Sequence, residues 1–185
     1  MKIKKILIVL IGIAILGGIM FAFMRKNQEK ENQVIEEIIP EQEISEEQER
    51  KTIIKLYFQD KETGELMGEF RTIDAKLLAN NPCEELIRLL IEGPQSENLQ
   101  KTLPEGTKIN SIKIEGNTVY VDLSKEFIDY HAEGIENERN TIYSIVNTLT
   151  ELNEVTFVRI QIEGQENLEF KDKGMNFKEN FERNN

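Results

Sequence analysis

An apolar run near the N-terminus constrains this chain more than any other feature of the sequence. Residues Ile6–Met24 read ILIVLIGIAILGGIMFAFM and contain no charged side chain. Built as a helix with a rise of about 1.5 Å per residue, the run approaches the roughly 30 Å thickness of a bilayer's hydrocarbon core. A cleaved signal peptide is the alternative, because lysines precede the run. Arg25 and Lys26 follow without a small-x-small cleavage site, which favours an uncleaved transmembrane anchor.

The predicted location is therefore the cytoplasmic membrane, with a single pass and an extracytoplasmic C-terminal domain. The short basic N-terminus most easily stays in the cytoplasm. Ala14, Gly18 and Ala22 are spaced four residues apart, so they predict a small-residue face on which two anchors pack. Chance spacing in a span that contains glycine and alanine is the alternative. Cys83 lies far from this segment, which excludes a lipid-modified cysteine there.

Charge limits the partners of the rest of the chain. The sequence holds 34 Asp and Glu against 23 Lys and Arg, with a net charge of −11. Such a chain is repelled by nucleic acid, so no nucleic-acid partner is expected. Residues 27–51 are rich in glutamate and lack aromatic residues, which predicts a solvated stalk rather than a binding segment. The predicted organisation is an anchor over residues 1–26, the acidic linker over 27–51, a domain over 52–164 and a polar tail over 165–185.

Periodicity within the domain predicts alternating strands and helices. Residues 52–58 (TIIKLYF) are rich in β-branched and aromatic side chains, as strands are, and a turn over residues 61–64 leads to a second extended segment over 66–73. Asn81 followed by Pro82 and Glu84 predicts the start of a helix, and Gly93 predicts its end.

The second half of the domain repeats this pattern. Residues 109–124 alternate apolar and polar side chains on both sides of a glycine turn, which predicts a hairpin. An apolar stripe predicts a helix over about 140–152, and residues 155–163 alternate as a last strand. The expected fold class is α+β with the order β-β-α-β-β-α-β. The expected architecture is a two-layer sandwich of one mixed sheet with both helices on one face.

Residues capable of catalysis are few. His131 is the one histidine, and no second histidine or nearby cysteine completes a zinc site with it. A catalytic triad would have to use His131 as its base, and the sequence around it shows no residue that would orient it. Cys83 in the first turn of a helix is interpreted as a small, half-buried residue, with an intermolecular disulfide as the alternative. Asp122 and Glu126 fall at the end of one strand and could be the carboxylates of a glycosidase, but Asp122 alternates outward, so a solvated face is the preferred interpretation. We therefore expect no enzyme activity, no cofactor and no metal.

Six segments occur in an order that resembles the GerMN domain family of sporulation and spore germination proteins. They are LYFQD, LLIEGP, LPEGTKI, VYVDLSKEF, TIYSIVNTLTEL and VRIQIEGQ, and the resemblance covers about Ile53 to Gly164. It implies an α+β domain like the ring-building motifs of bacterial channels, and no catalytic residue. It marks the following as structural signature positions: Tyr57, Gly93, Pro94, Pro104, Gly106, Asp122 and Thr148.

The expected function is a non-enzymatic module for protein interaction and assembly in a bacterial envelope, linked to sporulation or germination. Its expected partners are the membrane, other envelope proteins and further copies of itself. The alternative is an accessory domain that binds or hydrolyses peptidoglycan.

Overall fold

A computed structural model describes residues 50–184, which lie in one compact unit, Glu49–Asn185. The predicted membrane helix Ile6–Met24, its packing face of Ala14, Gly18 and Ala22, and nearly all of the predicted stalk lie outside the described residues.

The first sheet is built on a long antiparallel hairpin. Strand β1 (Lys51–Asp60) pairs with β2 (Leu66–Asp74) over nearly its whole length, and two residues of β3 (Leu99–Gln100) pair with the end of β1. The order is β2-β1-β3, so β2 forms one edge. The strand predicted over residues 52–58 places Ile54, Leu56 and Phe58 in the core.

The second sheet has the order β4-β5-β6 and is mixed. Strands β4 (Ile109–Glu115) and β5 (Thr118–Leu123) form the predicted hairpin, with Gly116 at a φ of 63° in its turn. Strand β6 (Phe157–Ile162) pairs parallel to β5. Parallel neighbours need a crossover, and the chain between β5 and β6 supplies one as helices.

Two longer helices connect the strands. Helix α2 (Pro82–Glu92) begins where predicted, since the Asn81 side chain accepts a hydrogen bond from the Glu84 amide at 3.1 Å. Helix α4 (Ile135–Leu149) begins about five residues before the predicted start and ends three before the predicted end. Its first turn is polar, so the apolar stripe alone did not reveal it. Two single-turn helices, η1 (Ala75–Leu78) and α3 (Glu126–Asp129), were not predicted.

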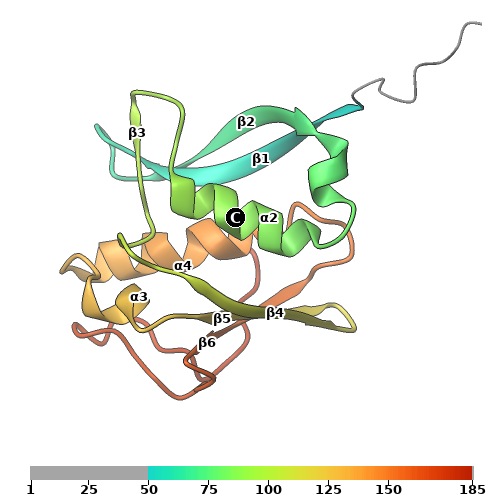
Figure 1. Cartoon of the computed structure of the whole chain (residues 1–185). Coiled ribbons are helices and arrows are strands. Elements are labelled where there is room, and N and C mark those ends of the chain that lie inside the picture. Colours follow the sequence, from blue (N-terminus) through green and yellow to red (C-terminus); the bar gives the residue numbers. More distant parts are fainter. Residues whose placement is uncertain (1–49, 185) are drawn as a thin grey trace, which may run out of the picture. The chain divides into compact units, whose positions relative to one another are not determined.

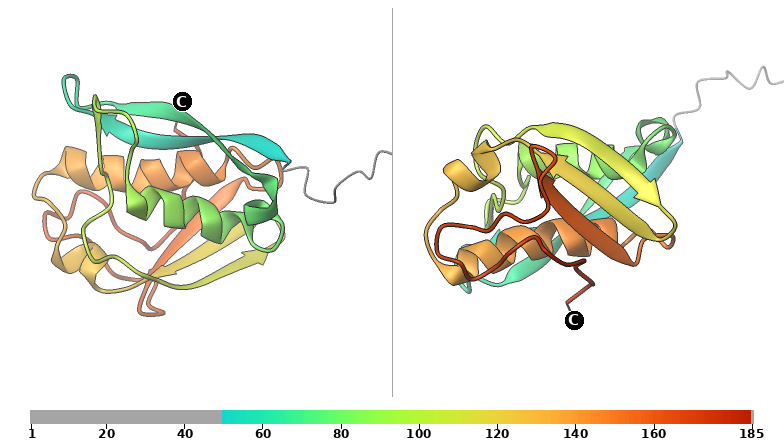
Figure 2. Two further views of the ribbon diagram at one scale, coloured as in Figure 1. Left: turned by 45° about the horizontal axis from the view of Figure 1, so that its top comes forward. Right: turned by 90° about the horizontal axis from the view of Figure 1, so that it is seen from below.

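The α+β class is confirmed, but the predicted two-layer sandwich is wrong. Figure 1 shows α2 and α4 between the two sheets, with β1 and β2 on one side and β4, β5 and β6 on the other, and Figure 2 shows the same layers from two further directions. Helix α4 packs mainly on β1, and α2 contacts both β1 and β4. The sequence predicted one sheet, but β1–β2 and β4–β5–β6 form two. Each sheet buries one apolar face against the same pair of helices, α2 and α4.

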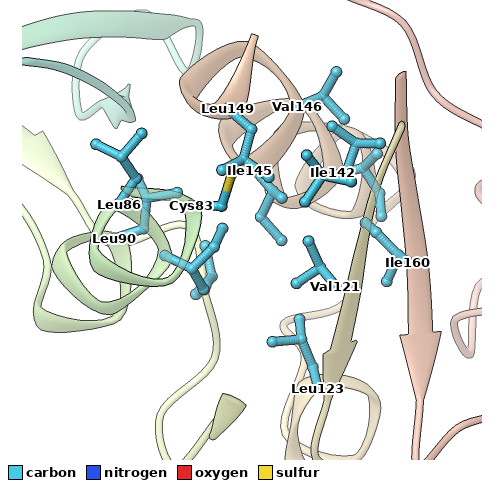
Figure 3. Close-up of a cluster of buried hydrophobic side chains, with 14 of the residues drawn as sticks. Cys83, Leu86, Leu90, Val121, Leu123, Ile142, Ile145, Val146, Leu149 and Ile160 are labelled. Carbon is cyan, nitrogen blue, oxygen red and sulfur yellow. The ribbon is translucent and has the colours of Figure 1, made fainter. Parts of the chain in front are cut away.

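The core fills the space between the layers. Figure 3 shows Cys83, Leu86 and Leu90 of α2 facing Ile145 and Leu149 of α4, with strands β5 and β6 beyond. All of these side chains are almost fully buried. Each buried aliphatic side chain contributes about 1.5–3 kcal/mol of transfer free energy, so this layer carries much of the fold's stability.

Residues after β6 are part of the fold, although the sequence showed only a polar tail there. Phe170 and Phe177 are buried and pack on Phe127 of α3, with ring centroids 5.5 and 6.2 Å from it. The buried Glu138 carboxylate of α4 accepts hydrogen bonds from the amides of Asp172, Gly174 and Met175 at 2.8–3.0 Å. Phe170 and Phe177 of the tail are therefore core residues.

The predicted location needs a correction. We expected a single-pass protein of the cytoplasmic membrane, but none of the helices in residues 50–184 combines the length and apolar character that crossing a bilayer requires. The predicted location is withdrawn on this finding.

Candidate functional site

The crossover between α2 and β4 holds four of the predicted signature residues. Gly93 ends α2 at a φ of 99°, a left-handed conformation that favours glycine, and Pro94 follows it. Pro104 and Gly106 form a turn, in which the Thr107 amide and hydroxyl both donate to the Pro104 carbonyl. These residues shape the ends of the crossover and supply no reactive group.

The β1–β2 hairpin holds the start of this crossover. The Arg71 guanidinium of β2 donates to the Gly93 carbonyl at 2.5 Å, and the Glu69 carboxylate accepts from the amides of Gln95 and Ser96. Glu69 and Arg71 also bond each other at 2.6 Å, and both side chains are mostly buried. A loop tied down by several bonds to a strand is poorly suited to act as a mobile lid.

Two further signature residues meet in the core. Thr148 of α4 accepts a hydrogen bond at its Oγ1 from the Tyr57 amide of β1, at 3.1 Å. This amide points away from β2 and has no strand partner on that side. The Thr148 hydroxyl therefore supplies the hydrogen-bond acceptor that a neighbouring strand would otherwise offer to the Tyr57 amide. This explains why a polar side chain lies on the buried face of α4. Asp122 lies elsewhere, with its Oδ1 accepting from the Gly164 amide at 2.9 Å.

A polar cluster surrounds the Tyr57 hydroxyl. The hydroxyl donates to Glu151 Oε1 at 2.8 Å, and Arg183 near the C-terminus bonds both of them. Lys55 Nζ lies 3.8 Å from Glu151 Oε1 and 4.7 Å from the Tyr57 ring centroid. Partial burial alone would raise the pKa of Glu151, but the hydrogen bonds from Arg183 and Tyr57 outweigh it, so its pKa lies below the usual value of 4.5. The cluster ties strand β1, the end of α4 and the C-terminal segment together.

A polar groove of about 740 Å³ opens beside this cluster. The hairpin contributes Gln59 and Leu66 to its walls, and α4 contributes Arg139, Tyr143 and Asn147. The walls mix amide, cationic and aromatic groups with the carboxylates of Glu65 and Glu136. The groove therefore offers hydrogen-bonding groups and charges of both signs to a polypeptide or a polar ligand.

The outer face of the β1–β2 hairpin carries an exposed apolar patch, which we call the hairpin patch and define as Ile53, Lys55 and Phe70. Ile53 and Phe70 are 70% and 69% exposed. The Lys55 side chain lies directly over Gly68, where an added Cβ would meet its Cε at 2.3 Å, and its Nζ lies 5.5 Å from the Phe70 ring centroid. Large exposed apolar side chains beside a cation–π contact are typical of protein-binding surfaces.

His131 lies apart from both features and has a role in holding the fold. Its ring packs on Phe170 at a centroid distance of 4.2 Å, and its Nε2 lies 2.9 Å from Thr141 Oγ1. Thr141 donates its own proton to the Thr102 carbonyl, so it accepts from an Nε2–H of the histidine. Burial is the main cause that lowers the pKa of His131 below 6.5. These contacts describe a neutral, packed ring.

The remaining candidate groups, Cys83 and Glu126, have pKa values shifted away from those that reactive groups need. Burial raises the pKa of the Cys83 thiol to about 11, far from that of a reactive thiolate. A hydrogen bond from Ser124 holds the pKa of the Glu126 carboxyl below its usual value, whereas the acid of a glycosidase needs a raised pKa. Within residues 50–184, no group of three or more His, Cys, Asp or Glu side chains is placed to hold a metal ion.

Reasoning from sequence missed several residues that hold this region together, namely Glu69, Arg71, Glu138 and Arg183. Their charges look like ordinary surface charges in the sequence. One signal was present for Glu69 and Arg71, because opposite charges two residues apart in a strand (LMGEFRTID) lie on the same face. No local signal marks Arg183, whose partners lie 32 and 126 positions away.

Fold and surface together define a class: a three-layer α+β domain whose distinctive surfaces are a polar groove and an exposed hairpin patch. Residues 55–168 match the family described as "Germane: Sporulation and spore germination". The match covers more than half of the chain, so the chain belongs to this family of sporulation and spore germination proteins. The resemblance noted in the sequence is thereby confirmed.

Solved structures agree at the level of fold. The tandem GerMN domains of the sporulation protein GerM from Bacillus subtilis are 22% identical with a TM-score of 0.59, and the match covers 72% of this chain and 46% of that one. This chain thus spans about half of the tandem-domain protein. The first GerMN domain of the same protein, also 22% identical, has a TM-score of 0.60, with 71% and 98% covered. At this identity the likeness shows the fold alone. No curated protein matches the chain.

Proposed function

We propose that this chain is a non-enzymatic module for protein interaction and assembly that acts in sporulation or spore germination. Family membership over residues 55–168 is the observation that carries the proposal. The hairpin patch supports it, because Ile53 and Phe70 expose large apolar surfaces that a partner protein would cover. The structural roles of His131, Cys83 and Glu126 support a binding function over a catalytic one.

Cross-linking in sporulating cells tests this proposal. The full chain carries an affinity tag, and covalent adducts with other proteins are identified at intervals through sporulation and germination. We expect adducts in the wild type and their loss in Ile53→Glu, which places a charge in the patch. Ile114→Glu is the matched control, since Ile114 is another exposed isoleucine, 48% exposed, on the opposite sheet. Recovery of the uncross-linked chain at every stage would contradict the proposal.

A cell-wall function is the competing reading, and the same protein tests it. Incubation of the full chain with purified peptidoglycan measures retention and release of fragments. We expect neither to change in the double variant Asp122→Asn and Glu126→Gln. Hydrolysis by the wild type that disappears in this variant would replace the interaction proposal with an enzymatic one.

A further inference from the structure

The polar groove beside the Tyr57 cluster follows one face of helix α4. Its volume of about 740 Å³ lies within the range of about 300–1,000 Å³ that is typical of ligand sites. The α4 residues that line the groove are spaced three or four apart, so they form one stripe along the helix: Glu136, Arg139, Asn140, Tyr143 and Asn147. The tip of the β1–β2 hairpin forms the opposite wall.

Two buried asparagines in this stripe have polar atoms that the fold does not use. Asn140 and Asn147 are only 8% and 7% exposed. Asn140 Nδ2 donates to the Gly64 carbonyl at 2.8 Å, and Asn147 Oδ1 accepts from the Asn184 amide at 3.3 Å, so these backbone partners fix the orientation of both side-chain amides. Within residues 50–184, Asn140 Oδ1 and Asn147 Nδ2 have no hydrogen-bond partner. Buried polar groups are normally paired, so an unused acceptor and an unused donor in the wall of a groove indicate a ligand.

The spacing and polarity of the two asparagines match the backbone of an extended polypeptide. They lie seven positions apart on α4, which is about 10.5 Å along the helix axis. Three residues of an extended segment span about 10 Å, and the N–H of the first and the C=O of the third point to the same side. The N–H would donate to Asn140 Oδ1, and the C=O would accept from Asn147 Nδ2. This order places the N-terminal end of the segment at Asn140, so the segment runs parallel to α4.

We propose that the groove binds an extended segment of a partner protein, parallel to α4, through backbone hydrogen bonds to Asn140 and Asn147. This inference rests on the proposed interaction function and gives the chemistry of the partner. Glu136 precedes Asn140 on α4, and Glu65 follows the glycine that Asn140 contacts, so both carboxylates line the end where the segment enters. In the described part of the chain neither forms an ion pair. Charge complementarity therefore selects a Lys or Arg before the three bridging residues.

A phage library of linear heptapeptides, selected on the purified full chain, tests this inference. Enriched peptides are synthesised with a fluorescent label, and their Kd is measured by fluorescence polarisation. We expect them to carry Lys or Arg toward the N-terminal end. Asn147→Asp replaces the donor with an oxygen but keeps the oxygen that accepts from Asn184. We expect this variant to bind the peptides at least about 10-fold more weakly than the wild type.

A control variant and a peptide series make the result specific. Asn117→Asp introduces the same charge at an exposed residue in the turn between β4 and β5, and it should leave the Kd unchanged. In the peptide series, each backbone N–H is methylated in turn, and binding to the wild type is measured. Methylation should weaken binding at the first of the three bridging residues but not at the second, because successive amides of an extended chain point to opposite sides. This series also carries the test if Asn147→Asp does not fold.

Three results would each overturn the inference: no enriched peptide, equal Kd values for Asn147→Asp and Asn117→Asp, or methylation tolerated at every position. A tetramer of N-acetylglucosamine is the glycan probe. Binding of this tetramer that Asn147→Asp loses would assign the groove to a glycan and overturn the polypeptide. Enriched peptides without Lys or Arg would overturn the charge preference.

The proposed function is measured separately, by adducts in cells and their loss in Ile53→Glu. If those adducts form while no heptapeptide binds, the groove is rejected and the interaction function stands. If a heptapeptide binds as expected while the chain forms no adduct at any stage, the groove stands and the proposed function in sporulation or germination is rejected.

Discussion

Removing the Thr148 hydroxyl tests how α4 replaces a strand beside β1. Thr148→Val keeps the shape of the side chain but deletes the oxygen that accepts the Tyr57 amide at 3.1 Å. Thr148 is fully buried and Tyr57 is 8% exposed, so water does not easily replace the lost acceptor. A buried donor left without a partner costs about 1–3 kcal/mol of unfolding free energy. At about 4 °C per kcal/mol for a domain of this size, the melting temperature should fall by about 4–12 °C.

Thermal unfolding of the full chain, followed by circular dichroism, measures this loss. Thr148→Ser is the control, because it keeps the oxygen and removes only a methyl group, at a cost of about 1 kcal/mol. We expect the Thr148→Val variant to have a lower melting temperature than the Thr148→Ser variant. Hydrogen exchange at the Tyr57 amide should also be faster than in the wild type in Thr148→Val, but not in Thr148→Ser. A Val variant as stable as the wild type, with Ser below it, would refute the reasoning, since packing rather than the hydrogen bond would then hold the two elements together.

Three further predictions concern the groups around this core. Glu138→Gln removes the charge that accepts three tail amides and should cost about 1.5–3 kcal/mol, seen as faster proteolysis after residue 165 than in the exposed control Glu136→Gln. Because the pKa of Cys83 is about 11, about one thiol in a thousand is ionised at pH 8, so a thiol reagent should label it only after denaturation. Glu151→Gln should lower stability at pH 6, and the difference from wild type should shrink as the pH falls below about 4.5.

The direction of the Glu151 effect follows from its lowered pKa. The folded chain holds this carboxylate ionised more strongly than the unfolded chain does, through Arg183 and Tyr57. Its contribution is therefore fully present above the unfolded pKa and is lost as the pH falls through the folded one. A difference that stays constant from pH 6 to pH 3 would show that Glu151 acts through packing instead of charge. For Cys83, rapid labelling of the folded chain would show that the helix opens readily.

Local sequence signals determined the elements of this fold. The β-branched and aromatic residues of 52–58 and the alternation in 109–124 predicted strands, and Asn81, Pro82 and Gly93 predicted the bounds of α2. Composition, turns, caps and periodicity are all local signals, which depend on neighbouring residues. Their order also carried the family resemblance. The class of the fold and the structural nature of its turn residues followed from these signals.

Tertiary structure alone decided which strands pair and which charges are buried. Nothing near Leu56 or Val121 in the sequence tells whether their strands join one sheet or cover two faces of the same helices. Likewise, Glu138 and Arg183 are ordinary charges until the fold brings amides, a hydroxyl and a carboxylate to them from distant positions. Strand pairing and buried polar contacts join residues far apart in the chain, and their energies depend on burial, which the sequence does not record.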